Sequence, residues 1–490
     1  RSPESVTLRD IYVRMADRRS EMQGAKWRTI DHLPIASERR TEVHDAEIRF
    51  SRRIENFRAK RRPCFEFAPR ISSEQLDALA KQDPVPLSVA SRISQILRYT
   101  LLSLRWEPQN YSAEHRGVAS AGGLFSTESY LLVRHGGRTR MFHISPANMC
   151  LIELDPVGSN IGVGESSTRI LTVGKLSHSA IDYAEFGIGL AVLEAGMIHA
   201  QLALTGHALG LRSRQTSDDI ADDAVQQCIC RHWSDIPVAC LELETGAANW
   251  IEDLYERDLA VAVESEDYGP AERLENLPGL TRAFSLPTGM SRANSASDYG
   301  LGQPESMIPL FACIEQRSSG YLLGKGKTKR TVRFEDLEDA LMIACRMFRG
   351  ISDEAPVVSV AFRPKGADFP ILYRLDVMDG SLVPARQGQF ASSAADRVCS
   401  GEVSAVVTIG FEEAALFDAI DRATLWLPFS MVGTVAQCIC LSAAAKGFFA
   451  RPSRAEPEKF VNLLLPPDAA GILQILVGVN SLPAPFLPLQ

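Results

Sequence analysis

The chain has no pair of cysteines at C-x-x-C spacing, although it contains ten cysteines in 490 residues. Two pairs have C-x-C spacing, Cys228/Cys230 and Cys438/Cys440, and the second lies in an apolar run where thiols behave as small hydrophobic side chains. A zinc site needs close cysteine pairs with further Cys or His at matching spacing. The pattern therefore predicts no metal site and reduced structural cysteines, as in a cytoplasmic protein.

An excess of positive charge is also missing, because 60 acidic residues outnumber 52 basic ones and the net charge is −8. This balance argues against a nucleic-acid partner, which needs a basic surface. The exception is residues 1–59, which we predict to form an Arg-rich helical arm. Its arginines form either a solvated helix face or a docking arm for an acidic partner.

Long hydrophobic runs are scarce, and we expect none to approach the ~20 residues needed to span a bilayer. The charged start of the sequence has no apolar signal-peptide region. We therefore predict a cytoplasmic protein with no membrane partner. A chain of this length suits two to three domains, and 45% hydrophobic residues is ordinary for a folded protein.

The chain does contain an internal repeat. The interval from Gly196 to Gly210 equals the interval from Gly433 to Gly447. The residues between each pair are apolar or small on nearly every face, which predicts two helices buried all round. The second glycine of each pair is expected to end its helix.

A second feature repeats upstream of these helices. An Arg-led turn at Arg62 precedes a helix expected from about Ile71, and one at Arg317 precedes a helix expected from about Val332. The repeat predicts two domains, 60–250 and 305–490, joined by a connecting segment.

That connecting segment is 251–304, and its part from Pro270 onward is rich in Pro, Gly, Ser and Asn, as linkers are. Helices and strands mix without strict βαβ alternation, which favours the α+β class. Strands are expected at 129–133, 238–243, 357–362 and 403–409, and the last residues, 482–490, as an extended arm laid across the other half.

A family resemblance appears in the first half. The segment 119–130, Ala-Ser-Ala-Gly-Gly-Leu-Phe-Ser-Thr-Glu-Ser-Tyr, is similar to the Pro-Ser-Ala-Gly-Ala-Leu-Tyr-Pro-Leu-Glu-x-Tyr signature of SagB/ThcOx-type dehydrogenases. These enzymes form the azoline-oxidising branch of the nitroreductase superfamily. Residues 140–151 and 181–196 resemble further segments of that family, in the same order. The resemblance covers most of 60–245 and is weaker over 305–490.

The resemblance implies two tandem nitroreductase-like domains, each a mainly antiparallel sheet flanked by helices, that form an internal pseudo-dimer with FMN at their interface. Whether two such chains associate further into a homodimer is left open. The family's phosphate turn is Arg-x-Ser-x-Arg, and the second half keeps Arg317, Ser318 and Ser319. Small residues beside the flavin ring are kept only in the first half, as Ser120, Ala121, Gly122 and Gly123.

Each half thus keeps what the other has lost, which predicts one complete FMN site per chain, with the second site decayed. Arg451, after the second buried helix, either adds charge at the phosphate or is an ordinary surface arginine.

The catalytic residues are the least complete part of the resemblance. The family's Lys-Tyr pair corresponds to Asp182 and Tyr183, so the tyrosine survives and the lysine does not. Asp182 is either a base whose pKa is raised by burial or a surface helix residue. His199 lies on the buried helix, where a satisfied core histidine is the more common role.

The function that the resemblance implies is FMN-dependent oxidation of a peptide-derived or other natural-product intermediate, with azoline-to-azole oxidation as the leading reaction and O2 reoxidising the flavin. The substrate is a peptide or small molecule, free or bound to a carrier or leader. Two alternatives stay open: another flavin-dependent desaturation or nitro/quinone reduction on the same scaffold, and a flavin-free interaction protein.

Overall fold

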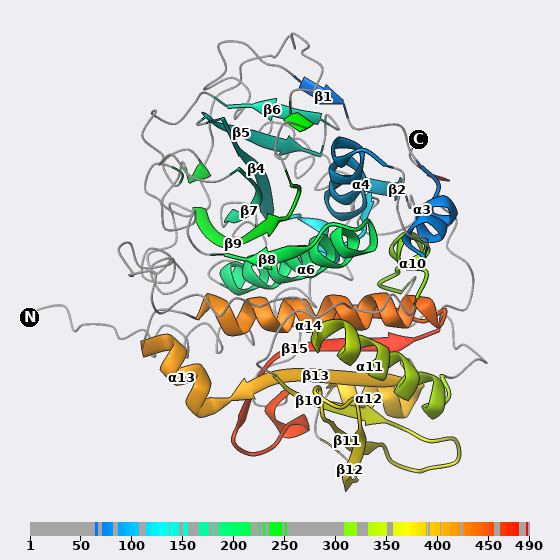
Figure 1. The fold of residues 1–490 in the computed structure, drawn as a ribbon. Helices are drawn as coiled ribbons and strands as arrows, with labels where there is room; N and C mark the ends of the chain where they lie inside the picture. The colour runs from blue at the N-terminus through cyan, green and yellow to red at the C-terminus, as the bar shows by residue number, and fades with distance from the viewer. Residues whose placement is uncertain are drawn as a thin grey trace, which may run out of the picture.

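The structure is a computed structural model (Figure 1), and it describes most of both predicted domains. The predicted arm 1–59 and nearly all of the connecting segment 251–304 lie outside the described residues. The described residues are 64–66, 71–81, 87–106, 114–136, 138–146, 150–154, 166–175, 186–216, 235–246, 308–320, 332–349, 356–388, 393–401, 403–421, 425–454, 461–479 and 487–488, with Ser179, Tyr183, Val225, Ile229, Cys230, Trp250, Ile251 and Phe390.

The first half is built on a seven-stranded sheet of order β1-β6-β5-β4-β7-β9-β8, in which every neighbouring pair is antiparallel. The inner strand β7 is buried along its whole length, because both of its faces are covered. The strands are β1 (Cys64–Glu66), β4 (Thr127–His135), β5 (Arg138–Ser145), β6 (Cys150–Glu153), β7 (Ser167–Lys175), β8 (Ser213–Gln215) and β9 (Asp235–Leu243).

The second half repeats this sheet with six strands in the order β12-β11-β10-β13-β15-β14, again all antiparallel. Without β1, the two strand orders correspond one to one, which confirms the internal repeat and the α+β class. The strands are β10 (Val357–Phe362), β11 (Ile371–Leu375), β12 (Leu382–Gln387), β13 (Ala405–Glu412), β14 (Phe449–Ser453) and β15 (Ala469–Gly478). All four strands expected from the sequence are present, as parts of β4, β9, β10 and β13.

Helices cover the sheets, and two long ones lie side by side between them at the centre of the molecule (Figure 1). Buried side chains from both halves join in one continuous hydrophobic core around this central pair. The helices are α3 (Ser73–Ala80), α4 (Val89–Leu101), η1 (Ala121–Gly123), α6 (Gly187–Ala208), α10 (Leu310–Gln316), α11 (Phe334–Arg349), α12 (Ser393–Ser400), α13 (Glu413–Asp421), α14 (Trp426–Ala445) and η4 (Asn462–Leu464), the central pair being α6 and α14.

The repeated glycines set the spacing of the central pair. A Cβ atom at Gly196 of α6 would clash with the carbonyl of Ser430, and one at Gly433 of α14 would clash with the carbonyl of Leu193. The Thr434 hydroxyl also donates to the carbonyl of Gly196 at 3.3 Å. The two backbones therefore touch where they cross, and only glycine permits this approach.

Glycine also ends both helices, as the sequence predicted. Gly210 and Gly447 have φ values of +74° and +73°, in the left-handed region. The N–H of Leu211 donates to the carbonyl of Gly206, and the N–H of Phe448 donates to that of Ala443, each at 2.9 Å. This is the Schellman arrangement, which satisfies carbonyls left over at a helix end.

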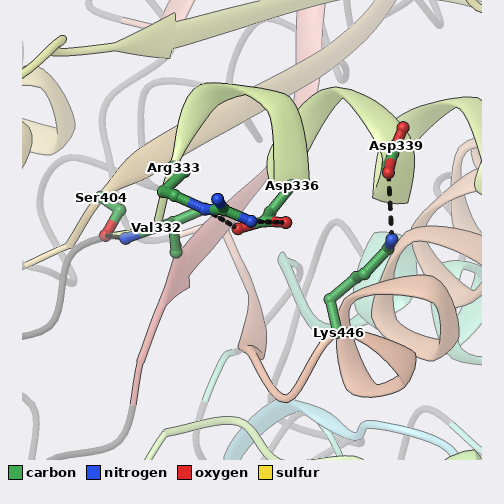
Figure 2. A network of polar contacts seen from close by, with 6 residues as sticks. All are labelled: Val332, Arg333, Asp336, Asp339, Ser404 and Lys446. Atoms are coloured by element: carbon green, nitrogen blue, oxygen red, sulfur yellow. Dashed lines mark hydrogen bonds and ion pairs between the residues drawn. The ribbon is translucent and has the colours of Figure 1, made fainter.

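Helix α11 covers α14 in the second half and is tied to its neighbours by polar contacts at its N-terminal part (Figure 2). Arg333 forms a two-pronged ion pair with Asp336 at 2.6 and 2.8 Å, and Lys446 contacts Asp339 at 3.1 Å. Both pairs are partly or largely exposed and contribute little to stability; of the two, the Lys446–Asp339 pair joins α11 to the end of α14, whereas the Arg333–Asp336 pair is local to the start of α11.

The end of the chain returns to the first half. Strand β16 (Leu487–Pro488) pairs with β2 (Ser103–Trp106), which also pairs with β3 (Glu114–Arg116) in a three-stranded sheet. For Leu487 and Pro488, this confirms the expected contact with the other half; the remaining residues of 482–490 lie outside the described residues.

The expectation that no apolar segment approaches the length of a membrane span was wrong when helices are judged by length and composition alone. Helices α6 and α14 are both long and apolar enough to span a bilayer, but 94% of each apolar window is buried inside the fold. The sequence predicted both as buried helices, but small residues and isolated polar groups interrupt their apolar runs and made the runs look short. Burial on all sides makes them core helices of a soluble fold.

Candidate functional site

The Arg-led turn of the second half lies at the junction with the first half. Arg317 ends α10, and its side chain is 3% exposed. Its Nε donates to the carbonyl of Gly117 at 2.9 Å and its Nη2 to the carbonyl of Arg116 at 3.0 Å. In return, Nη2 of Arg105 donates to the carbonyl of Arg317 at 2.9 Å. Residues two hundred positions apart in the chain are therefore held together by hydrogen bonds.

Helix α10 is itself fixed by the first half. The Asp77 carboxylate of α3 accepts hydrogen bonds from the N–H groups of Phe311 and Ala312, both at 2.9 Å. A carboxylate at a helix N-terminus is favourable because the amide dipoles point their positive ends there. Burial raises the pKa of Asp77, while these two hydrogen bonds oppose that shift.

The serines after Arg317 shape the turn. The Ser319 hydroxyl accepts from Nη1 of Arg317 at 3.3 Å, and the Ser318 hydroxyl accepts from the N–H of Gly320 at 3.1 Å. The carbonyl of Ser318 accepts from the N–H of Ala450 at 3.0 Å, so Arg451 follows directly beside the turn with an exposed side chain. The structure thus brings Arg317, Ser318, Ser319 and Arg451 into one corner of the molecule.

This corner is rich in buried positive charge. Arg105, Arg116 and Arg317 are all at least 92% buried, and His115 lies between two of them. Burial, together with the charges of Arg317 and Arg105, holds the pKa of His115 well below its usual range. His115 is therefore neutral, and the guanidinium groups supply the charge of the corner.

The Ser120–Gly123 segment follows Gly117 closely and forms a tight turn. Gly122, Gly123 and Phe125 have φ values of +63°, +70° and +48°, and Phe125 is the non-glycine residue with positive φ in the described part of the chain. The Ser120 hydroxyl accepts from the N–H of Phe125 at 2.8 Å and closes the turn. A non-glycine residue in this region is strained and is held by its surroundings.

Two charged residues hold the Phe125 end of the turn. The Arg116 guanidinium lies 3.6 Å above the centre of the Phe125 ring. Glu194, on α6, accepts from the Thr127 hydroxyl at 2.6 Å. Beneath the turn, a cavity of about 30 Å³, with room for roughly one water molecule, is lined by residues that include Arg116, Phe125, Thr127, His143 and Glu194.

Tyr183 lies against the same turn. Its hydroxyl is close enough that a Cβ atom built on Gly122 would come within 3.0 Å of it. Its ring is 6.5 Å from that of Phe186, the residue that precedes α6. Asp182, its predicted partner, lies outside the described residues.

An arginine from the second half reaches the start of α6. The guanidinium carbon of Arg454 lies 4.4 Å from the Phe186 ring centre and 5.0 Å from that of Phe429. A Cβ atom on Gly189 would meet Nη1 of Arg454, so the missing side chain at Gly189 makes room for this guanidinium. The sequence carries a weak signal for this contact, a basic residue shortly after the second buried helix.

Two further ionisable groups are buried: Lys175, which had no usable signal in the sequence, and His199, for which the sequence favoured a core role. Lys175 of β7 is fully buried and pairs with Asp235 at 2.9 Å and Glu128 at 3.4 Å. Burial lowers the pKa of Lys175, but the two carboxylates outweigh it and the pKa is raised well above its usual value. His199 is a core residue, and burial lowers its pKa to about 4.

No protein-family model and no curated protein matches the chain. Among solved structures, a candidate nitroreductase from Anabaena variabilis aligns with a TM-score of 0.57 and 14% sequence identity, over 86% of this chain and 93% of that one. A candidate nitroreductase from Ralstonia eutropha aligns over 37% of this chain and 88% of that one, with 18% identity and a TM-score of 0.28. The first match extends over both halves, and it shows that the chain has a nitroreductase-like fold of two tandem α+β domains.

Proposed function

We propose that the chain is an FMN-dependent oxidoreductase that holds one FMN at the junction of its halves. The observation that carries the proposal is the set of hydrogen bonds from Arg317 to the carbonyls of Arg116 and Gly117. They bring the remaining phosphate turn of one half next to the remaining Ser-Ala-Gly-Gly turn of the other. Neither half contains both.

The residues at the corner fit a phosphate. The hydroxyl groups of Ser318 and Ser319 accept hydrogen bonds from the protein, and hydroxyl groups of this kind are common donors to phosphate oxygens. The buried charge of Arg317 lies behind them, and Arg451 adds an exposed charge beside them. Charge-assisted contacts of this kind are among the stronger hydrogen bonds to phosphate.

The turn of the first half fits a planar ring. Ala121 has a small side chain, and Gly122 and Gly123 have none, so a ring can approach the backbone N–H groups. The Tyr183 hydroxyl faces Gly122, which places a proton donor and acceptor beside that backbone. Bound FMN would supply hydride acceptance at this place.

Proton removal is the task of the chain's own residues. We assign Tyr183 to hold the substrate or pass on its proton, with Asp182 as the accepting base. Positioned groups of this kind are typically worth roughly 10²–10⁴-fold in rate. Arg454 fixes the start of α6, the helix that follows these two residues.

The substrate that we propose is a peptide-derived or other natural-product intermediate, free or bound to a carrier or leader, with azoline-to-azole oxidation leading and O2 as electron acceptor. We propose that the protein acts in the cytoplasm. A different desaturation, or nitro or quinone reduction, uses the same flavin position, and a flavin-free interaction role is the alternative from a different class.

The test is the flavin content of the purified, FMN-supplemented protein after removal of unbound cofactor. We expect a yellow protein that releases about one equivalent of FMN per chain on denaturation. Two equivalents would contradict the assignment of a single site, and none would favour the interaction protein. The rate of turnover of a synthetic azoline peptide, compared with that of a nitroaromatic compound, then separates the two enzymatic alternatives.

A further inference from the structure

Glu194 is the acidic residue of α6, a helix made mostly of apolar and small residues. It lies in the middle of α6, is 4% exposed, and is accompanied there by no Asp, Lys or Arg. Burial raises the pKa of Glu194, because the charged form loses its water. A buried carboxyl group destabilises a fold unless hydrogen bonds compensate for the lost hydration.

The compensating hydrogen bonds all come from one turn. The Thr127 hydroxyl donates to Oε1 of Glu194 at 2.6 Å, and the Ser120 hydroxyl and the N–H of Ser126 also bond to the carboxyl group. The guanidinium of Arg116 adds a favourable charge. Glu194 therefore fastens both ends of the Ser120–Thr127 turn to the core helix.

The internal repeat shows that the fold itself does not require this acid. With Gly196 matched to Gly433, the position of Glu194 corresponds to Met431 on α14, which is 6% exposed. An apolar side chain thus fills the equivalent core position, and the second half has no Ser-Ala-Gly-Gly turn. The acid and the turn occur together.

We propose that Glu194 is a positioning residue that holds the Ser120–Thr127 turn in its ligand-binding shape. The inference rests on the proposed function, since the ligand of the turn is the flavin ring. The turn needs such an anchor because it contains three residues with positive φ, one of them the strained Phe125. Apart from the contacts of Glu194, the Ser120 end of the turn is closed by local hydrogen bonds, whereas the Ser126 carbonyl also accepts from the N–H of Lys175 on β7 at 2.7 Å.

The test compares Glu194→Leu, Glu194→Gln and, as a control on the same helix, Thr205→Val. Thr205 is buried and its hydroxyl donates to the helix backbone, at 2.7 Å to Gln201, so its removal leaves the turn untouched. Three properties are measured: hydrogen exchange of residues 120–127 and thermal unfolding in flavin-free protein, and FMN affinity with the visible circular dichroism of the bound flavin.

In Glu194→Leu we expect faster exchange over 120–127 and FMN affinity weaker by about tenfold or more, as for the loss of a hydrogen bond to a charged group. The unfolding temperature should stay equal or rise, because a buried carboxyl group is removed. Glu194→Gln keeps an acceptor oxygen, so it should restore exchange, affinity and the dichroism signal. Thr205→Val should match the parent in exchange and affinity.

Parent-like exchange in Glu194→Leu would overturn the proposal, as would a lower unfolding temperature in step with the loss of FMN, which marks a general core role. Failure of Glu194→Gln to restore the turn would also overturn it. The proposed function fails separately, if the parent chain takes up no FMN, and the exchange data on flavin-free protein still decide the anchoring role.

Discussion

Arg317 and Gly117 are joined by a hydrogen bond of 2.9 Å from Nε to the carbonyl oxygen. Gln437 of α14 donates to the same carbonyl at 3.1 Å. Two side chains of the second half therefore fix the strand end that leads into the Ser120 turn of the first half. The proposed site is shaped by contacts between the halves.

Replacing Arg317 by Ala should weaken FMN binding by about ten- to hundredfold, because the variant loses the buried charge behind the proposed phosphate position and the charge-assisted hydrogen bonds that hold the turn, each worth roughly 1.5–3 kcal/mol. Fluorescence titration of apoprotein with FMN measures the affinity. Arg346→Ala, on an exposed face of α11, is the matched control and should bind as the parent does. Equal retention of FMN by both variants would place the phosphate elsewhere.

Replacing Gly196 by Ala should destabilise the fold by about 1–3 kcal/mol, the usual cost of overpacking, because the new Cβ meets the Ser430 carbonyl. Gly206→Ala on the same helix meets only atoms at 3.6 Å or beyond and should be neutral or stabilising. Urea unfolding of flavin-free protein measures both variants. Similar midpoints for the two would show that the helices do not touch at Gly196.

Replacing Tyr183 by Phe should slow flavin reduction by substrate, by up to roughly 10²–10⁴-fold, while the spectrum of bound FMN stays normal. Stopped-flow absorbance measures the reduction rate. For Asp182→Asn, a loss that is independent of pH fits a base, whereas a loss that disappears at high pH fits tuning of Tyr183. Parent rates in both variants would assign proton removal to another group.

His199 should make the fold sensitive to acid. Its pKa is about 4 in the fold and 6.5 as the ordinary value, so the unfolded chain binds the proton more readily. Stability is therefore complete above pH 6.5 and falls as the pH drops toward 4, by at most about 3 kcal/mol. His115 acts in the same direction.

In His199→Gln, the free energy of unfolding should fall less steeply between pH 7 and 4.5 than in the parent. Thr205→Val, on the same helix, removes no titratable group and provides the control, which should keep the parent slope. A parent slope in His199→Gln as well would show that His199 does not contribute.

The sequence predicted the fold to the extent that periodicity and glycine placement carry it. Gly196 and Gly433 located the central helices because close packing requires the absence of a side chain. The resemblance located Ser120–Gly123 and Tyr183, and the structure brings them together. Although Glu194 lies in the segment 181–196 that resembles the family, no role was predicted for it, because a single acidic residue in a mostly apolar helix forms no recognisable sequence pattern.

Other contacts depend on tertiary structure alone. Lys175 meets Asp235 and Glu128 across three strands, so no local spacing reveals the group. The stacking of Arg454 on Phe186 joins residues from different halves. The positive φ of Phe125 is equally hidden, since local preference argues against it.

Two matched contacts join the central helices, Gly196 with Ser430 and Gly433 with Leu193. They have the geometry of a two-fold subunit interface, but both sides belong to one polypeptide. In a symmetric dimer of identical chains, every substitution appears on both sides of the axis. The two halves of a single chain have separate sequences, so Glu194 can contact its turn while Met431 occupies the matching position. Two covalently joined halves can therefore carry different residues at matched positions, which identical subunits cannot do.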